Sequence, residues 1–153
     1  MGLFYKKYRF QTAWQKEELL ERLKAETDTF DRDGTTKSFE GKVLPSGKFV
    51  LKSLIDFHAR NQFRPDIHFT VTNQNVAVVF QLNPTMKFFI PFLFLFNTGV
   101  GFFFYFQLKD PQFLLLIPFI LIFMGMMALQ FRSKTQKSVQ VLERIFEASS
   151  EVV

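Results

Sequence analysis

The residues best suited to chemistry cluster in the segment 56–68, Asp-Phe-His-Ala-Arg-Asn-Gln-Phe-Arg-Pro-Asp-Ile-His. It holds both histidines of the chain and repeats the pattern Asp-x-His. Imidazole and carboxylate groups bind divalent metals, and residues i and i+2 of a strand share one face. A metal-dependent enzyme is therefore one hypothesis, with four candidate ligands: Asp56, His58, Asp66 and His68. We favour the alternative that these are ordinary surface or half-buried residues, without a metal, a cofactor or a catalytic role.

Several other kinds of chemistry lack the residues that they need. The chain has no cysteine, which excludes disulfides, thiolate nucleophiles and thiolate metal sites. It has no glycine-rich phosphate-binding loop, and nothing like a nucleophile elbow surrounds Ser53. These absences favour a binding or structural protein over an enzyme.

The basic residues are distributed unevenly along the chain. Nineteen lysines and arginines against 14 acids give a net charge of +5, and most of the bases precede residue 88. In residues 3–10, Lys6, Lys7 and Arg9 interleave with aromatic side chains, a mixture that suits lipid headgroups. One interpretation of this segment is a membrane-surface anchor; the other is an edge strand or an ordered tail of the folded domain. We expect no nucleic-acid partner.

Two long apolar runs, 88–106 and 112–131, contain no acid or base. About 20 apolar residues in a helix cross a bilayer core about 30 Å thick. The five-residue break between the runs holds Lys109 and Asp110, and a basic tail with Arg132 follows. This pattern predicts a transmembrane hairpin in the cytoplasmic (inner) membrane, a multi-pass topology and both termini in the cytoplasm.

Small and polar residues interrupt the apolar runs. An amide in hydrocarbon needs a hydrogen-bond partner, and small residues let helices approach closely. One interpretation is packing within the hairpin; another is a homo-oligomeric seam; a pore is a third. The candidate packing residues are Asn97, Gly99, Gly101 and Gly125.

The remaining segments predict a small α+β domain around this hairpin. Residues 12–26 are typical of a helix that begins with a Thr12–Gln15 capping box. Residues 39–53 and 67–82 alternate apolar and polar side chains, which predicts two β-hairpins in one antiparallel sheet of about four strands. Residues 138–149 predict a short amphipathic helix. The expected organisation is a cytoplasmic domain at 1–87, the hairpin at 88–131 and a cytoplasmic tail at 132–153.

One series of motifs resembles a known family. The order is Phe39-x-Gly41, then Phe49, then Arg60-Asn61-x-Phe63-x-Pro65-x-Ile67, then the apolar hairpin. It resembles a family of small uncharacterised bacterial membrane proteins over about residues 38–131. The chain departs from that pattern where His58-Ala59 replaces an aromatic residue, Gln62 replaces Ser and Phe69 replaces Gly. The resemblance implies an architecture and no activity.

Together these features favour a non-enzymatic, membrane-anchored binding or assembly module. Its small β domain would meet a protein partner or anionic lipid. The alternative is a small subunit of a membrane complex whose hairpin makes the interactions, as a homo-oligomer or with other chains. The candidate binding residues for a partner or lipid are Arg60, Asn61, Arg64, Lys6, Lys7 and Arg9.

Overall fold

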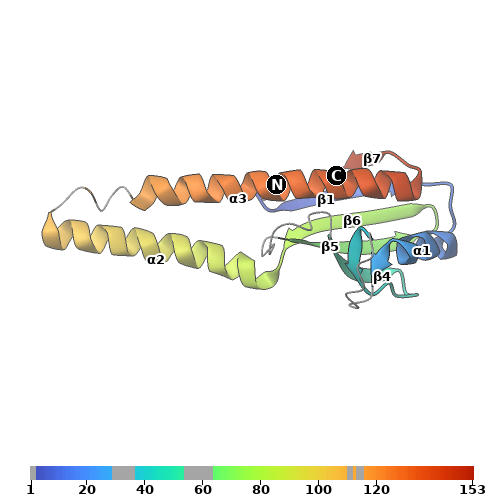
Figure 1. Ribbon diagram of the computed structural model, residues 1–153, viewed down its shortest axis with the longest axis horizontal. Coiled ribbons are helices and arrows are strands. Elements are labelled where there is room, and N and C mark those ends of the chain that lie inside the picture. The colour runs from blue at the N-terminus through green and yellow to red at the C-terminus, as the bar shows by residue number, and fades with distance from the viewer. Residues whose placement is uncertain (1–2, 29–36, 54–63, 110–111, 113–115) are drawn as a thin grey trace. The chain divides into compact units, whose positions relative to one another are not determined.

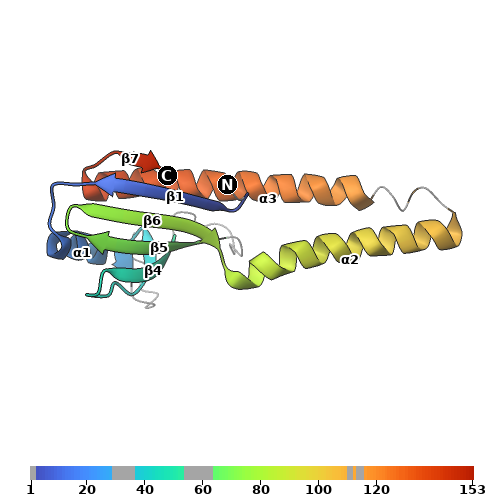
Figure 2. The same cartoon turned by 180° about the vertical axis from the view of Figure 1, so that it is seen from behind.

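The computed structural model describes residues 3–28, 37–53, 64–109, 112 and 116–153. This part of the chain forms an α+β structure with a mixed sheet of seven strands and three helices (Figures 1 and 2). The strands are β1 (Tyr5–Gln11), β2 (Thr27–Asp28), β3 (Phe39–Gly41), β4 (Lys48–Ser53), β5 (Pro65–Thr72), β6 (Asn75–Leu82) and β7 (Ser150–Val152). The helices are α1 (Lys16–Ala25), α2 (Pro84–Leu108) and α3 (Leu116–Phe146).

The chain divides into two compact units. The sheet unit comprises Met1–Leu82 together with Phe131–Val153, and the helical unit is Asn83–Gln130. The sheet unit therefore uses segments from both sides of the apolar helices.

The sheet is larger than the four antiparallel strands expected from the sequence. Its order is β2-β3-β4-β5-β6-β1-β7, and only the pairing of β2 with β3 is parallel. The basic and aromatic segment 5–11 forms β1, which is hydrogen-bonded to β6 on one side and to β7 on the other. Tyr8 and Phe10 are buried while Arg9 between them is exposed, and this period of two lets the segment pair as a strand.

One face of the sheet forms the core. Alternate residues of the central strands point to it, and the direct pairings Phe49–Phe69, Ile67–Phe80 and Val71–Val76 align them across the sheet. Phe49 and Phe69 stack at 5.0 Å between ring centroids. Within the sheet unit, α1 and α3 add buried apolar side chains to this core: Leu19, Leu23, Phe131, Val139, Leu142 and Phe146.

Helix α1 begins later than the sequence suggested. Its N-cap is Gln15, which forms a capping box with Glu18, whereas we expected the box at Thr12 and Gln15. The Thr12 hydroxyl instead accepts a hydrogen bond from the Trp14 amide and donates one to the carbonyl of Phe146. The residue expected to cap one helix thus ties β1 to the end of α3.

Helix α3 corrects a second expectation. We expected separate segments at 112–131 and 138–149, but Leu116–Phe146 is one helix of 31 residues. No Gly or Pro interrupts residues 126–146, and the polar stretch beginning at Arg132 contains good helix formers. Polarity changes there while the backbone stays helical.

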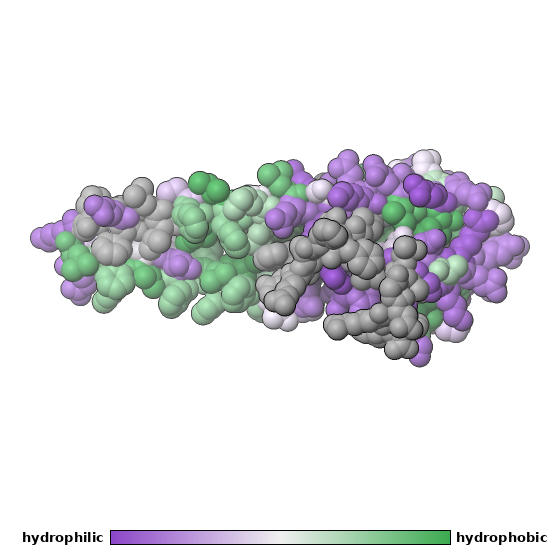
Figure 3. Space-filling view, viewed as in Figure 1, coloured by the Kyte–Doolittle hydropathy of each residue, from purple (hydrophilic) through white to green (hydrophobic). Residues whose placement is uncertain are grey.

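Helices α2 and α3 are long and apolar enough to cross a membrane. Only 11% of the apolar window of α2, and 22% of that of α3, is buried. Figure 3 shows apolar residues gathered over the helical unit and polar residues over most of the sheet unit. Helix α2 begins at Pro84 with Asn83 as its N-cap and ends at Leu108, where Lys109 forms a left-handed C-cap.

Candidate functional site

The sheet face opposite the core carries a row of basic and polar side chains. Lys48, Thr70, Ala77 and Arg9 are direct neighbours across four strands. The next row contains Val50, His68, Val79 and Lys7 in the same order. All eight are exposed or half-buried, so this open face can meet another molecule.

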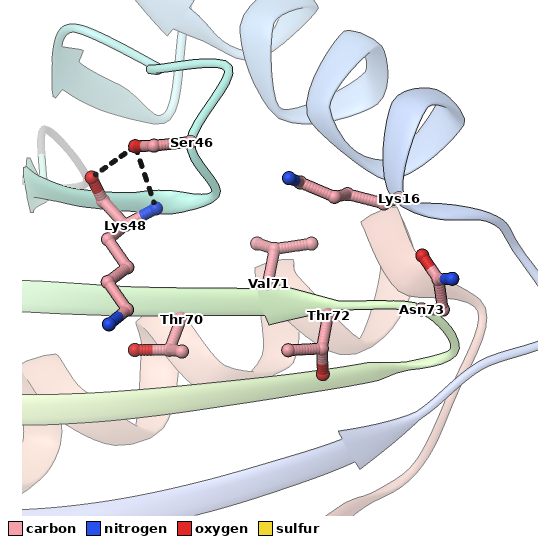
Figure 4. A pocket seen from close by; sticks show the side chains of 7 residues that line it. All are labelled: Lys16, Ser46, Lys48, Thr70, Val71, Thr72 and Asn73. Atoms are coloured by element: carbon pink, nitrogen blue, oxygen red, sulfur yellow. Dashed lines mark hydrogen bonds between the residues drawn. The ribbon is translucent and has the colours of Figure 1, made fainter.

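A concavity lies at one end of this sheet, where β5 continues beyond the start of β4. Lys48 pairs with Thr70, and the turn before Lys48 closes against the next residue of β5. The Val71 amide donates to the carbonyl of Gly47 at 2.7 Å, and the Gly47 amide donates to the carbonyl of Leu44 at 3.0 Å. The resulting space is about 530 Å³ and is lined by Lys16, Ser46, Lys48, Thr70, Val71, Thr72 and Asn73 (Figure 4).

Gly47 allows this close approach of turn and strand. Its φ is +77°, a conformation that favours glycine. A Cβ there would lie 2.6 Å from the Val71 carbonyl oxygen and 3.1 Å from Cε of Lys16. The Ser46 hydroxyl bonds the backbone N–H and carbonyl of Lys48 at 3.4 and 3.3 Å, so it stabilises the turn.

The concavity is cationic. Two of its seven lining residues are lysines, and none is an acid. In the part of the chain that the structure describes, neither lysine amine has an ion-pair partner. In Figure 4, Lys16 reaches over Val71 from α1, and Lys48 extends from β4 beside Thr70.

The structure separates the predicted binding residues. Lys7 and Arg9 lie on the open face of β1, whereas Lys6 pairs with Phe80 and is half-buried. Arg64 precedes β5, two strands away from β1, and its Nη1 lies 3.1 Å from Oε2 of Glu40. Arg60 and Asn61 lie outside the described residues.

Of the four candidate metal ligands, the structure places two. Asp66 and His68 share the open face of β5, but Asp66 is only 8% exposed. The His68 imidazole contacts the side-chain amide of Gln81 on β6. Asp56 and His58 lie outside the described residues. Within the described ranges, no group of three possible ligands gathers.

The candidate packing residues of the helical unit lie in different surroundings. The Asn97 amide donates to the carbonyl of Leu93 within α2 at 2.8 Å. Gly101 is buried. Within the described residues, a Cβ added at Gly99 or Gly125 would meet no atom within 4 Å.

The sequence did not single out the cationic concavity. Its one local signal is the turn Pro45-Ser46-Gly47, because the other lining residues come from α1 and from β5. Only the strand register shows that Lys48 and Thr70 are neighbours. No known family model matches the chain, and the chain is similar to none of the curated proteins and none of the solved structures, so its function has to be inferred from its own residues.

Proposed function

We propose that this chain is a non-enzymatic, membrane-anchored binding module. In this proposal α2 and the first part of α3 cross the cytoplasmic membrane as a hairpin. The sheet unit and both termini stay in the cytoplasm, and the open face of the sheet meets a protein partner or anionic lipid. The observation that carries the proposal is the exposure of large apolar side chains along both helices.

These side chains are largely exposed in the described part of the chain. Phe88 is 80% exposed, Leu95 69%, Phe106 72%, Phe119 67% and Leu129 66%. A helix that is apolar all round is either a core helix or a membrane span. Low burial argues against a core helix, and the positions within the chain argue against a signal sequence. At about 1.5 Å per residue, the 25 residues of α2 extend for about 38 Å, enough for a bilayer core of about 30 Å.

Flanking charges support the orientation. Lys87 stands near the start of α2, and Arg132, Lys134 and Lys137 follow the apolar part of α3. The connection between the two helices contains Lys109 as its single base. An excess of bases beside the spans is typical of the cytoplasmic side.

The open face of the sheet supports the binding role. Lys7 and Arg9 give it positive charge on β1, as does Lys48 on β4, while Val50 and Val79 give it apolar area. A positive surface that also has exposed apolar groups suits an acidic protein surface or anionic headgroups.

Cysteine labelling tests the topology, because the chain has no cysteine of its own. We would introduce Glu17→Cys, Gln112→Cys and Glu151→Cys at exposed positions. A membrane-impermeant maleimide should label the Gln112 variant in intact spheroplasts, and the other two only after permeabilisation. Labelling of Glu17→Cys from outside would show that the orientation is the opposite of the one proposed. A chain that stays soluble without detergent would contradict the membrane hairpin itself.

Affinity purification from native membranes tests the binding role. The wild type is compared with the double variant Lys7→Gln/Arg9→Gln and with Lys24→Gln, a control on α1. Partners or anionic lipids that use the open face should be lost with the double variant alone. Retention of every partner and lipid by the double variant would contradict a role for this face and favour the alternative in which the hairpin makes the interactions.

A further inference from the structure

We propose that the open face of the sheet binds an amphipathic α-helix of a protein partner, a helix with acidic residues along both of its sides. This inference rests on the proposed function and names the chemistry of the partner. Its structural basis is the distribution of side chains over four consecutive strands, β4, β5, β6 and β1. Figure 2 views the sheet from this face, with β1 in front of the C-terminal part of α3. Helix α3 therefore covers the core side and leaves this face open.

The two outer strands of this set carry the basic side chains. On β4, Lys48 and Lys52 are exposed on the open face and form the β4 flank. On β1, Lys7 and Arg9 lie on the same face and form the β1 flank. Within the described residues none of the four forms an ion pair. Glu151 is the direct neighbour of Arg9, but it stands on β7, beyond the β1 flank. The four bases are thus available to acids of another molecule.

The two central strands carry shorter side chains without lysine or arginine between the flanks. The central strip consists of four exposed or half-buried residues on β5 and β6: His68, Thr70, Ala77 and Val79. Val50, between the two lysines of β4, is 44% exposed and adds apolar area. Asp66 follows at one end of the strip, but it is only 8% exposed and contributes little surface. This face therefore matches a surface that is apolar in the middle and acidic on both sides.

The spacing of the two flanks suits the width of a helix. Strands β4 and β1 are three strand spacings apart, or about 14 Å at about 4.8 Å per spacing. An α-helix with its side chains is about 10–12 Å across. A helix that lies along the central strip can therefore be contacted by both flanks at once.

The spacing along each flank predicts where the acids of the helix stand. Lys7 and Arg9 are two residues apart, or about 6.6 Å along β1, which matches acids four residues apart on a helix, at about 6 Å. Lys48 and Lys52 are four residues apart, or about 13 Å along β4, which matches acids eight residues apart, at about 12 Å. One side of the helix thus carries acids one turn apart, and the other side carries acids about two turns apart.

Backbone hydrogen bonding favours a helix over an extended peptide. The backbone N–H and C=O groups of β5 and β6 are used between neighbouring strands, so the sheet face offers none to a ligand. An extended segment laid on this face would bury unpaired backbone groups, whereas a helix pairs its own. Lipid headgroups would supply negative charge but no apolar surface for Val50 and Val79. A helix satisfies both requirements.

A synthetic helix tests the site directly. The probe is a fluorescein-labelled peptide of about 16 residues with alanine and valine on one face and glutamates at the two predicted spacings. Fluorescence anisotropy measures its binding to the full chain in nanodiscs of neutral lipid, with empty nanodiscs as the blank. We expect a Kd of about 100 μM or tighter, and binding at least about tenfold weaker for a peptide of the same composition in scrambled order. Equal binding of the two peptides, or no saturation below about 1 mM, would overturn the proposal.

Double variants test whether the helix lies between the flanks. Lys48→Gln/Lys52→Gln and Lys7→Gln/Arg9→Gln should each weaken peptide binding about fivefold or more. The control Lys24→Gln/Arg144→Gln removes the same charge from exposed positions on α1 and α3 and should leave the Kd unchanged. Circular dichroism verifies that each variant is folded. A loss confined to one flank, or an equal loss in all three variants, would contradict a helix held by both flanks.

Photocrosslinking in native membranes tests the occupant itself. The crosslinker p-benzoylphenylalanine replaces Thr70 in the central strip or, as a control, Gln140 on the exposed side of α3. We expect the Thr70 position alone to capture a protein segment with acids at helical spacing, identified by mass spectrometry. Capture of lipid alone, of a segment without such acids, or of nothing beyond the control would overturn the helical partner. Loss of a native partner from Lys7→Gln/Arg9→Gln without any helix captured would support the proposed function and end this inference. Peptide binding does not depend on membrane topology, so the two can fail separately.

Discussion

Ser53 at the end of β4 and Ser138 on α3 are hydrogen-bonded through their hydroxyls at 3.1 Å, and both residues are buried. The Ser138 hydroxyl also lies 2.9 Å from the carbonyl oxygen of Lys134. One turn earlier on α3, Thr135 is buried, and its hydroxyl has no hydrogen-bond partner in the described part of the chain. The Ser138 hydroxyl is thus hydrogen-bonded, whereas the Thr135 hydroxyl on the same helix has no partner among the described residues.

This contrast predicts stability changes of opposite sign. Ser138→Ala leaves Ser53 without its partner and should lower the free energy of unfolding by about 1–3 kcal/mol. Thr135→Val replaces an unsatisfied hydroxyl by a methyl group of similar size and should raise it by about 1 kcal/mol. Thermal unfolding in detergent followed by circular dichroism measures both. Destabilisation by Thr135→Val would show that its hydroxyl is satisfied in solution.

Gly47→Ala should destabilise the sheet unit. The substitution combines a positive φ with a Cβ 2.6 Å from the carbonyl oxygen of Val71. The left-handed conformation alone costs about 1–2 kcal/mol, and displacement of the turn adds to it. Gly99→Ala is the matched control, because its Cβ meets open space on a helix. If the two variants melt at the same temperature in detergent, the turn does not have the geometry described.

Tyr8 makes stability depend on pH in the alkaline range. Burial, and secondarily the Glu143 carboxylate, raises the pKa of its phenol above 10.0. Between the two pKa values the unfolded chain has lost this proton while the folded chain keeps it. Stability is therefore intact below about pH 10 and falls as the pH rises above it, by at most about 1.4 kcal/mol per unit.

Tyr8→Phe should remove the part of the loss of folding stability at alkaline pH that comes from this phenol. Tyr5→Phe is the control, because Tyr5 is 43% exposed on the same strand. Chemical denaturation at about pH 9, 10 and 11 measures how steeply the free energy of unfolding falls with pH. An unchanged slope in Tyr8→Phe would mean that another group causes the loss.

Asn97 tests the predicted oligomeric seam. Its side chain donates one hydrogen bond within α2, and an amide has a second donor hydrogen and a carbonyl oxygen that another helix can engage. We expect Asn97→Leu to reduce crosslinked oligomers in membranes several-fold, whereas Phe96→Leu, its exposed neighbour, should not. Identical crosslinking of the wild type and both variants would remove Asn97 from any seam.

The sequence predicts the strongly alternating strands and the long apolar helices. Residues 39–53 and 67–82 correspond to β3 to β6. These strands could be predicted because alternating apolar and polar side chains are by themselves sufficient to indicate a strand with one buried face. Strand β1 was harder to assign, since only Tyr8 and Phe10 are buried among bases. Strands β2 and β7 have two and three residues, too few for a period, and they form only through their neighbours.

The binding features were less accessible to sequence reasoning. Lys16 and Lys48 are 32 positions apart along the chain, and only the packing of α1 on the sheet brings them to one space. The sequence offered Arg64 as a binding residue, and its ion-pair partner in the structure is Glu40, which precedes it by 24 positions. Long-range neighbours of this kind leave no local pattern.

The sheet unit is built from both ends of the described chain, which constrains when it can fold during synthesis. Phe10 on β1 packs against Phe146 near the end of α3, with ring centroids 5.3 Å apart, and Thr12 bonds the carbonyl of that same residue. A nascent chain that has emerged only to Leu82 lacks this cover, so Phe10, Val78 and Phe80 remain without their full burial. Both apolar helices must therefore be synthesised before the core of the sheet unit can be completed.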